Sequence, residues 1–169
     1  MKTLLAFSIA MAGLVAGCSE STEAPATVAA SAPQHPWPEG DLQKIEASFG
    51  ETNETSSGLR WQPISSGSGD AHPLPGNTVN VHYRGTLLDG TVFDESYKRG
   101  EPIRFPVGMG RVIKGWDEAL PMMTKGEKRR IIIPYWLAYG EKGRPPTIPP
   151  KATLVFEVEL VGWESPTGS

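Results

Sequence analysis

The segment Thr78–Asp94, TVNVHYRGTLLDGTVFD, decides how this chain folds. In its first half Val79, Val81 and Tyr83 fall on one side of an extended chain, and polar residues fall between them. Such alternation predicts a strand with one buried face. The pair Asp89-Gly90 is typical of a tight turn, and the short run after it predicts a returning strand. The segment therefore predicts two antiparallel strands joined by a turn.

Short extended segments continue on both sides of this hairpin. Further strands are expected at residues 59–64, 102–107, 127–133 and 152–161. The best helix candidate is Val112–Leu120, because Ile113, Trp116 and Leu120 recur at three- and four-residue spacing and Pro121 follows. Several antiparallel strands with one amphipathic helix on one face predict an α+β domain.

Composition limits the class of protein. Hydrophobic residues make up 38% of the 169 residues and the net charge is −3, so the chain has the character of a globular protein with no expected affinity for nucleic acid. The 19 glycines and 16 prolines imply many turns and favour a β-rich fold. Cys18 is the only cysteine, which excludes an internal disulfide.

The N-terminus resembles an export signal. Lys2 precedes the apolar run Leu4–Ala16, which is shorter than the about 20 apolar residues of a membrane span. The run ends in Val15-Ala16-Gly17-Cys18, which resembles the lipobox of bacterial lipoproteins. The resemblance implies a signal peptide over residues 1–17 and acylation of Cys18. The alternative is an ordinary secretory signal with an incidental cysteine.

The segment after Cys18 predicts a tether. Residues 19–40 are rich in Ser, Thr, Ala and Pro, and such a stretch buries too little apolar surface to fold. The expected organisation is a lipidated N-terminus and flexible linker over 18–57, one domain over 58–164 and a tail over 165–169. Asp41–Gly50 has a weak helical pattern, so it is either a short docked helix or a frayed linker. By analogy with lipoproteins, Ser19 after the cysteine places the protein in a bacterial cell envelope, on the outer membrane facing the periplasm.

Several kinds of catalytic site are absent from the sequence. There is no G-x-S-x-G elbow, and the three histidines lack the spacing of metal ligands, so neither a metal nor a cofactor is expected. Lys125–Arg130 is a basic run interrupted by Glu127, which we interpret as a solvated strand end.

Aromatic residues gather near the ends of predicted strands and in loops. They are Tyr83, Phe93, Trp116, Tyr139 and Phe156. Either these rings pack a core, or they line a pocket for an apolar ligand. Composition does not choose between the two.

Four motifs carry a family resemblance. They are VHYRGTLLDGTVFDES (81–96), VIKGWDEAL (112–120), LAYGEKG (137–143) and IPPKATLVFEVEL (148–160). In order and spacing they resemble the FKBP-type peptidyl-prolyl cis/trans isomerases. The resemblance implies a twisted antiparallel sheet of about five strands wrapped around one short α-helix. It also implies non-covalent rotation of X-Pro bonds in exported proteins. The alternative is a prolyl-peptide-binding chaperone module with incidental turnover.

The resemblance also assigns site residues. Trp116 would form a pocket floor, Tyr139 would point its hydroxyl at a substrate carbonyl, and the backbone N–H of Ile113 would donate to a second carbonyl. Expected catalytic residues are Tyr83, Phe93, Asp94, Tyr139 and Phe156, and expected substrate-binding residues are Ile103, Val112, Ile113, Trp116 and Ile148. Expected partners are unfolded prolyl polypeptides, macrolide immunosuppressants and, through the lipid anchor, a membrane. We expect a monomer.

Three positions depart from the family pattern. Ile103 stands where an aromatic wall residue is common, and Thr147 stands at a loop tip that is usually apolar. These two positions bear on substrate preference and inhibitor affinity, but not on the reaction itself. The stretch Pro134–Leu137, PYWL, has bulkier aromatic residues than usual. We expect it to add packing under the following loop.

Overall fold

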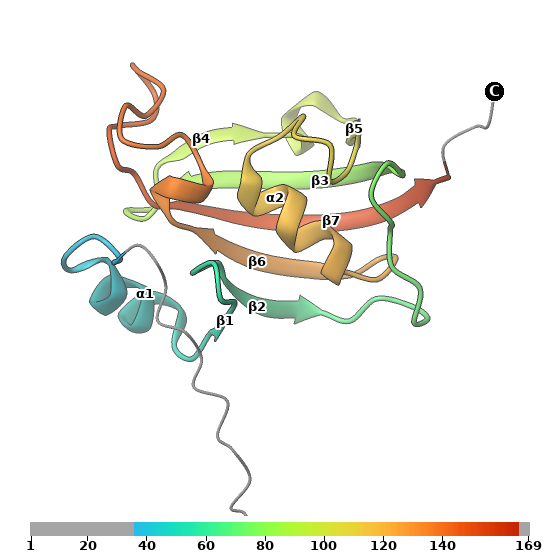
Figure 1. The fold of residues 1–169 in the computed structure, drawn as a ribbon, viewed down its shortest axis with the longest axis horizontal. Coiled ribbons are helices and arrows are strands. Elements are labelled where there is room, and N and C mark those ends of the chain that lie inside the picture. The colour runs from blue at the N-terminus through green and yellow to red at the C-terminus, as the bar shows by residue number, and fades with distance from the viewer. Residues whose placement is uncertain (1–35, 166–169) are drawn as a thin grey trace, which may run out of the picture. The chain divides into compact units, whose positions relative to one another are not determined.

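The computed structural model describes residues 36–165, which form one antiparallel sheet with a helix against each face (Figure 1). The strands are β1 (Asn53–Glu54), β2 (Arg60–Ser65), β3 (Thr78–Leu87), β4 (Val92–Glu95), β5 (Ile103–Pro106), β6 (Lys128–Ile133) and β7 (Leu154–Glu164). Their order is β1-β2-β6-β7-β3-β4, with β5 also paired to β3. The helices are α1 (Asp41–Phe49) and α2 (Lys114–Ala119), and short 3-10 helices are η1 (Tyr97–Arg99), η2 (Leu120–Met122) and η3 (Tyr135–Leu137).

The predicted fold class is confirmed. The alternation in Thr78–Leu87 becomes strand β3, in which Val79, Val81 and Tyr83 are buried. The sheet has seven strands rather than about five. The difference arises because two short strands share one edge of β3, and because β1 adds a two-residue edge beside β2.

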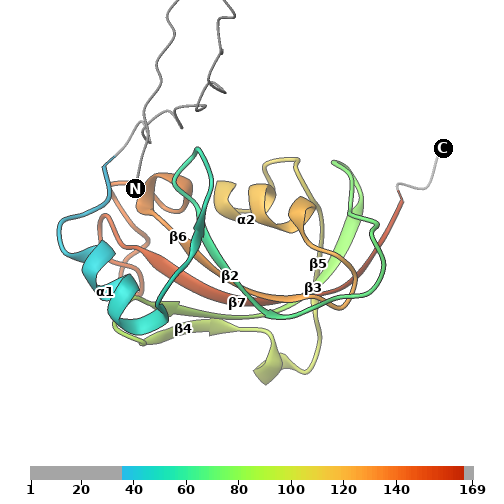
Figure 2. The same cartoon turned by 90° about the horizontal axis from the view of Figure 1, so that it is seen from below.

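The main core lies between the sheet and α2. Figure 2 shows the sheet curving around this helix. Gly115 permits the close approach, since a Cβ at this position would lie 2.5 Å from Cγ2 of Ile133 on β6. The helix passes at Leu120 into η2, which contains Pro121. The α2 side of the sheet thereby receives the indole of Trp116, which is 4% exposed.

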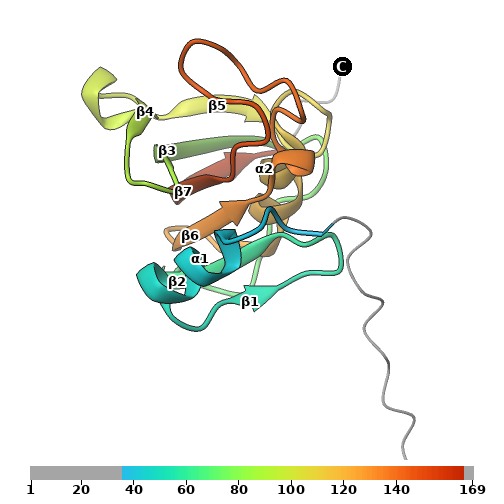
Figure 3. The same cartoon turned by 90° about the vertical axis from the view of Figure 1, so that its left-hand side faces the viewer.

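The opposite face of the sheet is covered at one end by α1, as Figure 3 shows. Ile45 of this helix is fully buried and packs in a second cluster with Ile132 and Val155. Alternate residues of a strand point to opposite faces, so Ile132 faces α1 while its neighbours in β6 face α2. The Asp41–Gly50 segment is therefore a docked helix, and this part of the predicted linker over 18–57 is packed against the domain.

The outer edge of β3 is divided between two partners. Thr78–Val81 pair with β5, and Arg84–Thr86 pair with β4. Between them the buried side chain of Ser96 completes the edge: its Oγ accepts the N–H of Tyr83 at 2.8 Å, and its own N–H donates to the Tyr83 carbonyl at 2.9 Å. The serine holds β4 and β5 apart at the middle of the strand.

The interpretation of Lys125–Arg130 as a solvated strand end holds for the exposed Lys125 and is wrong for Glu127 and Arg129. Glu127 and Arg129 are both buried, and Nε of Arg129 donates to Oε1 of Glu127 at 2.7 Å. The Arg129 guanidinium lies 4.0 Å from the ring centroid of Trp61. Arg129 lies two residues before Ile131 in β6 and so points to the same face, the α2 side, where Glu127 compensates its charge.

Some predictions fall outside the described residues, namely the signal peptide, Cys18, the first part of the linker and the last four residues of the tail. Within residues 36–165, no helix has the length and apolar character to cross a membrane.

Candidate active site

A cluster of aromatic rings forms around Trp116 on the α2 side of the sheet. The indole centroid lies 5.0 Å from the ring of Tyr83 and 5.2 Å from that of Phe156, both edge-on. Phe93 meets Phe156 edge-on at 5.4 Å. These are the favoured distances and geometries of aromatic pairs, so each ring helps to fix the next.

Gly85 makes room for this cluster. It faces Phe156 across the β3–β7 ladder, and a Cβ there would lie 2.7 Å from the rings of both Phe156 and Phe93. Real Cβ atoms do not approach other atoms so closely. The absence of a side chain at Gly85 therefore allows the two rings to lie over the sheet.

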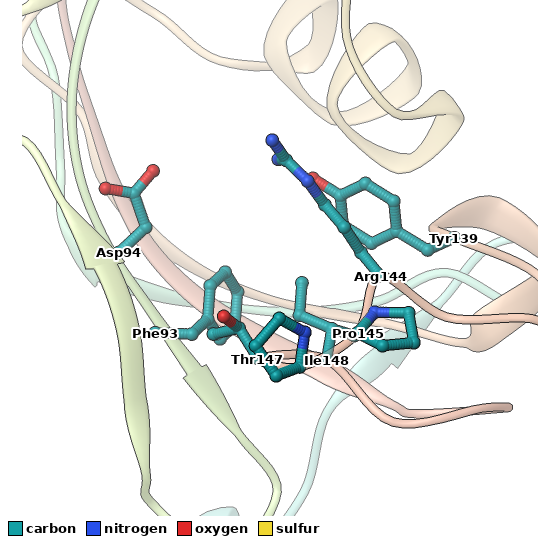
Figure 4. A pocket seen from close by; sticks show the side chains of 8 residues that line it. Phe93, Asp94, Tyr139, Arg144, Pro145, Thr147 and Ile148 are labelled. Atoms are coloured by element: carbon teal, nitrogen blue, oxygen red, sulfur yellow. The ribbon is translucent and has the colours of Figure 1, made fainter.

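Two adjoining cavities open beside the rings. The first, which we call the ring cavity, has a volume of about 200 Å³ and is lined by Tyr83, Phe93, Asp94, Ile103, Arg111, Val112, Ile113, Trp116, Tyr139 and Phe156. The second, the loop cavity, has a volume of about 440 Å³ and is lined by Phe93, Asp94, Tyr139, Arg144, Pro145, Pro146, Thr147 and Ile148 (Figure 4). The two cavities share three lining residues, Phe93, Asp94 and Tyr139, and so lie next to each other.

At the rim, Asp94 is held by two donors. The Tyr83 hydroxyl donates to Oδ2 at 2.5 Å, and the Arg99 guanidinium donates to Oδ1 at 2.8 Å. Arg99 also donates to the Tyr83 hydroxyl oxygen at 2.9 Å. Burial alone would raise the pKa of the Asp94 carboxyl, but the hydrogen bonds from Tyr83 and Arg99 lower it more, and the pKa lies below its usual value. Asp94 is therefore a carboxylate at neutral pH.

The same contacts act on Tyr83 in the opposite direction. Burial and then the hydrogen bond to Asp94 raise the pKa of the Tyr83 phenol above its usual value. Tyr83 therefore keeps its proton, and its ring stays neutral as part of the cavity wall. At neutral pH the pair is therefore a carboxylate that accepts a hydrogen bond from a neutral phenol.

Two hydrogen-bond donors at the site have no acceptor among residues 36–165. The Tyr139 hydroxyl points into the loop cavity, and none of the hydrogen bonds among residues 36–165 uses it (Figure 4). The backbone N–H of Ile113, just before α2, likewise has no acceptor in this part of the chain. Ile113 is fixed because its carbonyl accepts the N–H of Trp116 at 2.9 Å. Either donor could hold a carbonyl of a bound peptide.

The loop above the site is a closed turn. The N–H of Arg144 donates to the Ile148 carbonyl at 2.8 Å, and the N–H of Ile148 donates back at 3.0 Å. Gly143, with φ 65°, precedes this turn, and a Cβ there would lie 2.2 Å from the Pro149 carbonyl oxygen. The turn buries Ile148 against the core and projects Arg144 and Thr147 around the loop cavity.

Comparison with known proteins identifies a family for this chain. The family model described as FKBP-type peptidyl-prolyl cis-trans isomerase matches residues 69–161. The chain belongs to this family. Peptidyl-prolyl cis-trans isomerase FKBP15-2 of Arabidopsis thaliana is 48% identical to this FKBP over 128 residues, covering 75% of this chain and 77% of that one. Isomerase FPR2 of Saccharomyces cerevisiae is 60% identical over 93 residues, covering 54% and 69%. The crystal structure of FkpA from Escherichia coli superimposes with a TM-score of 0.65 at 43% identity, covering 74% of this chain and 57% of that one.

The protein is therefore an enzyme, a peptidyl-prolyl cis-trans isomerase of the FKBP type. Its fold brings together the residues that the sequence analysis selected: nine of the ten line the ring cavity, and Ile148 lines the loop cavity. No group of His, Cys, Asp and Glu side chains between residues 36 and 165 is placed to hold a metal ion.

Sequence analysis missed three arginines of this FKBP, namely Arg99, Arg111 and Arg144. Arg144 had a usable signal, because it lies between two of the family motifs, directly before a proline pair. Arg99 had none, since its contact with Tyr83 depends on the path of the chain through β4 and η1.

The aromatic stretch Pro134–Leu137 makes a contact that was not expected, in addition to its packing against the core. Nε1 of Trp136 donates to the Ser57 carbonyl at 3.0 Å, and its ring meets Trp37 edge-on at 5.7 Å. Trp136 therefore fastens the segment N-terminal to β2 onto the domain, and it also packs against the main core together with Leu137.

Proposed function

We propose that a prolyl ring of an unfolded exported protein enters the ring cavity and that the preceding peptide bond turns there without covalent chemistry. The observation that supports this most strongly is the set of touching rings around Trp116, which leaves an open, apolar cavity of about 200 Å³. Apolar cavities with few polar groups are typical of sites that bind by shape.

The barrier explains why such a site is sufficient. Partial double-bond character opposes rotation by about 18–20 kcal/mol, whereas the two forms of an X-Pro bond are nearly equal in free energy. Uncatalysed exchange takes tens to hundreds of seconds. An acceleration of about 10⁴–10⁵-fold to the millisecond range requires only about 5.5–7 kcal/mol. No bond has to be broken, so no nucleophile is needed.

Each part of the site has a role in this proposal. The planar amide is more charge-separated than the twisted one, so the rings disfavour the ground state more than the transition state. The Tyr139 hydroxyl and the Ile113 N–H hold carbonyls on the peptide while the bond turns. Asp94 keeps Tyr83 in place by accepting the hydrogen bond of its hydroxyl. Because the pKa of Asp94 is lowered, it has no proton to donate to the substrate at neutral pH.

The test is a prolyl-peptide isomerisation assay on the purified full-length protein. Phe93→Ala and Trp116→Ala should each lower kcat/KM at least tenfold, because each removes part of the cavity wall. A Phe93→Ala/Asp94→Ala double variant that turns over at the full rate would contradict the assignment. If the site serves mainly to hold clients, suppression of aggregation of an unfolded protein will survive in variants that have lost turnover.

We also propose that the protein is a monomer on the outer membrane of a bacterial cell envelope, facing the periplasm, with its lipid on Cys18. The lipobox resemblance at residues 15–18 supports this location. Radiolabelled palmitate should enter the wild-type protein and not Cys18→Ser, which should leave the membrane fraction. Equal labelling of both would refute the anchor.

The family membership supports a further proposal, that a macrolide immunosuppressant binds in the ring cavity and competes with substrate. Ile103, in place of an aromatic wall residue, should weaken that binding. Replacement of Ile103 by Phe should therefore lower the inhibition constant of the macrolide.

A further inference from the structure

The loop cavity contains a cation, Arg144, that forms no ion pair with any residue from 36 to 165. Arg144 is exposed, and its guanidinium lies 5.9 Å from the centroid of the Tyr139 ring. In Figure 4 it points across the cavity toward the side where Asp94 lies. The paired backbone hydrogen bonds to Ile148 fix the Cα of Arg144 beside the cavity, so the turn sets the point from which this side chain extends.

The neighbouring carboxylates are engaged by other cations. Asp94 is paired with Arg99 at 2.8 Å, and Glu141 is paired with Lys151 at 3.3 Å. Among residues 36–165 no ion pair involves Arg144. The ring cavity has a second cation, Arg111, on its wall. The mouth of the site is thus cationic, although the whole chain has a net charge of −3.

We propose that Arg144 gives this isomerase a preference for prolyl segments in which the residue next to the proline carries a carboxylate. This inference rests on the proposed function, in which the prolyl ring occupies the ring cavity. The two cavities share Phe93, Asp94 and Tyr139, so a residue adjacent to that proline enters the loop cavity beneath Arg144. A guanidinium binds a carboxylate through two parallel hydrogen bonds, which makes Glu or Asp the matching side chain.

Thr147 supports the same assignment. It stands at the tip of the turn and lines the loop cavity, where its hydroxyl adds a polar group beside the arginine. The Thr147 hydroxyl and the Arg144 guanidinium thus give the loop cavity two polar groups that are absent from the lining of the ring cavity.

The expected size of the preference follows from the exposure of the arginine. Solvent-exposed ion pairs contribute modestly, so we expect kcat/KM for a Glu peptide to exceed that for its Gln counterpart about two- to fivefold at low salt. Screening should reduce this ratio toward one in 1 M salt, where the Debye length is about 3 Å.

The experiment is a protease-free isomerisation assay, such as NMR exchange, on the full-length protein. The peptides carry Glu, Gln, Lys or Leu immediately before or immediately after a single proline. We expect a Glu-over-Gln ratio above two at one of these positions. Arg144→Gln should bring the ratio to one, and Arg144→Glu should invert it in favour of Lys. Arg104→Gln is the matched control: Arg104 pairs with Glu164 at 2.9 Å and lines neither cavity, so the ratio should stay as in the wild type.

Two results would overturn the inference: a wild-type Glu-to-Gln ratio of one at both positions, or a ratio that persists in Arg144→Gln. Failure of the proposed function would differ from both, since turnover of the Leu peptides would then survive removal of the rings by Phe93→Ala and Trp116→Ala.

Discussion

Replacement of Gly85 by alanine should damage the site by the addition of one methyl group. The new Cβ would lie 2.7 Å from ring atoms of Phe156 and Phe93, whereas ordinary contacts begin at 3.4 Å, so the rings must retreat by about 0.7 Å. Overpacking of this kind costs about 1–3 kcal/mol of stability. Because both rings line the ring cavity, and misplacement by about 1 Å can cost about 100-fold in rate, we expect kcat/KM to fall about tenfold.

Gly162→Ala is the matched control, since Gly162 lies on the neighbouring strand β7 and faces Asn80 of β3. A Cβ there would meet only Lys125, at 3.5 Å, which is an ordinary contact. Thermal unfolding and the isomerisation assay should find Gly162→Ala equal to the wild type or slightly more stable. If Gly85→Ala matches Gly162→Ala in both measurements, the rings do not depend on the missing side chain and the reasoning is refuted.

Three further predictions concern other parts of the domain. Tyr139→Phe should lower kcat/KM about two- to tenfold with an unchanged Tm, because its hydroxyl has no partner within residues 36–165; a large drop in Tm would show a structural role. The pKa of Asp94 lies below its usual value, so its stabilising contribution is present above about pH 4 and is lost as pH falls through the lowered pKa. Urea unfolding should therefore find a stability gap between wild type and Asp94→Asn that is constant from pH 8 to pH 5 and narrows in stronger acid; a gap that widens in acid would refute the sign. Ile45→Ala should lower the free energy of unfolding by about 2–4 kcal/mol and leave kcat/KM within twofold of wild type, because α1 lies on the face away from the rings.

The regular parts of the fold could be predicted from the sequence because their patterns are local. The polarity alternation from Val79 to Tyr83 needs only the two-residue period of a strand, and the strand forms as predicted. The spacing of Ile113, Trp116 and Leu120 likewise predicts the turn of helix that supplies the indole, although α2 itself is shorter, Lys114–Ala119.

Features that depend on distant partners could not be predicted in this way. Arg129 looks like a solvent-exposed charge until Glu127 and Trp61 are placed beside it. Arg99 reaches Tyr83 only because η1 follows β4 at the edge of the sheet. Helix α1 can dock because the side chains of Ile132 and Val155 point to the face of the sheet opposite α2. A run of three consecutive isoleucines in the sequence does not reveal which element covers the middle one.

The way in which the sheet ends has a consequence for a protein that handles extended chains. An open strand edge invites another polypeptide to add to it, which is a route to edge-to-edge aggregation. Here β3 presents no long open edge, because β5, Ser96 and β4 occupy it in turn. At the other side Pro63 lacks the N–H that an incoming strand would need from β2. The outer edge of β3 and the part of β2 around Pro63 therefore leave little room for another polypeptide to add as a strand.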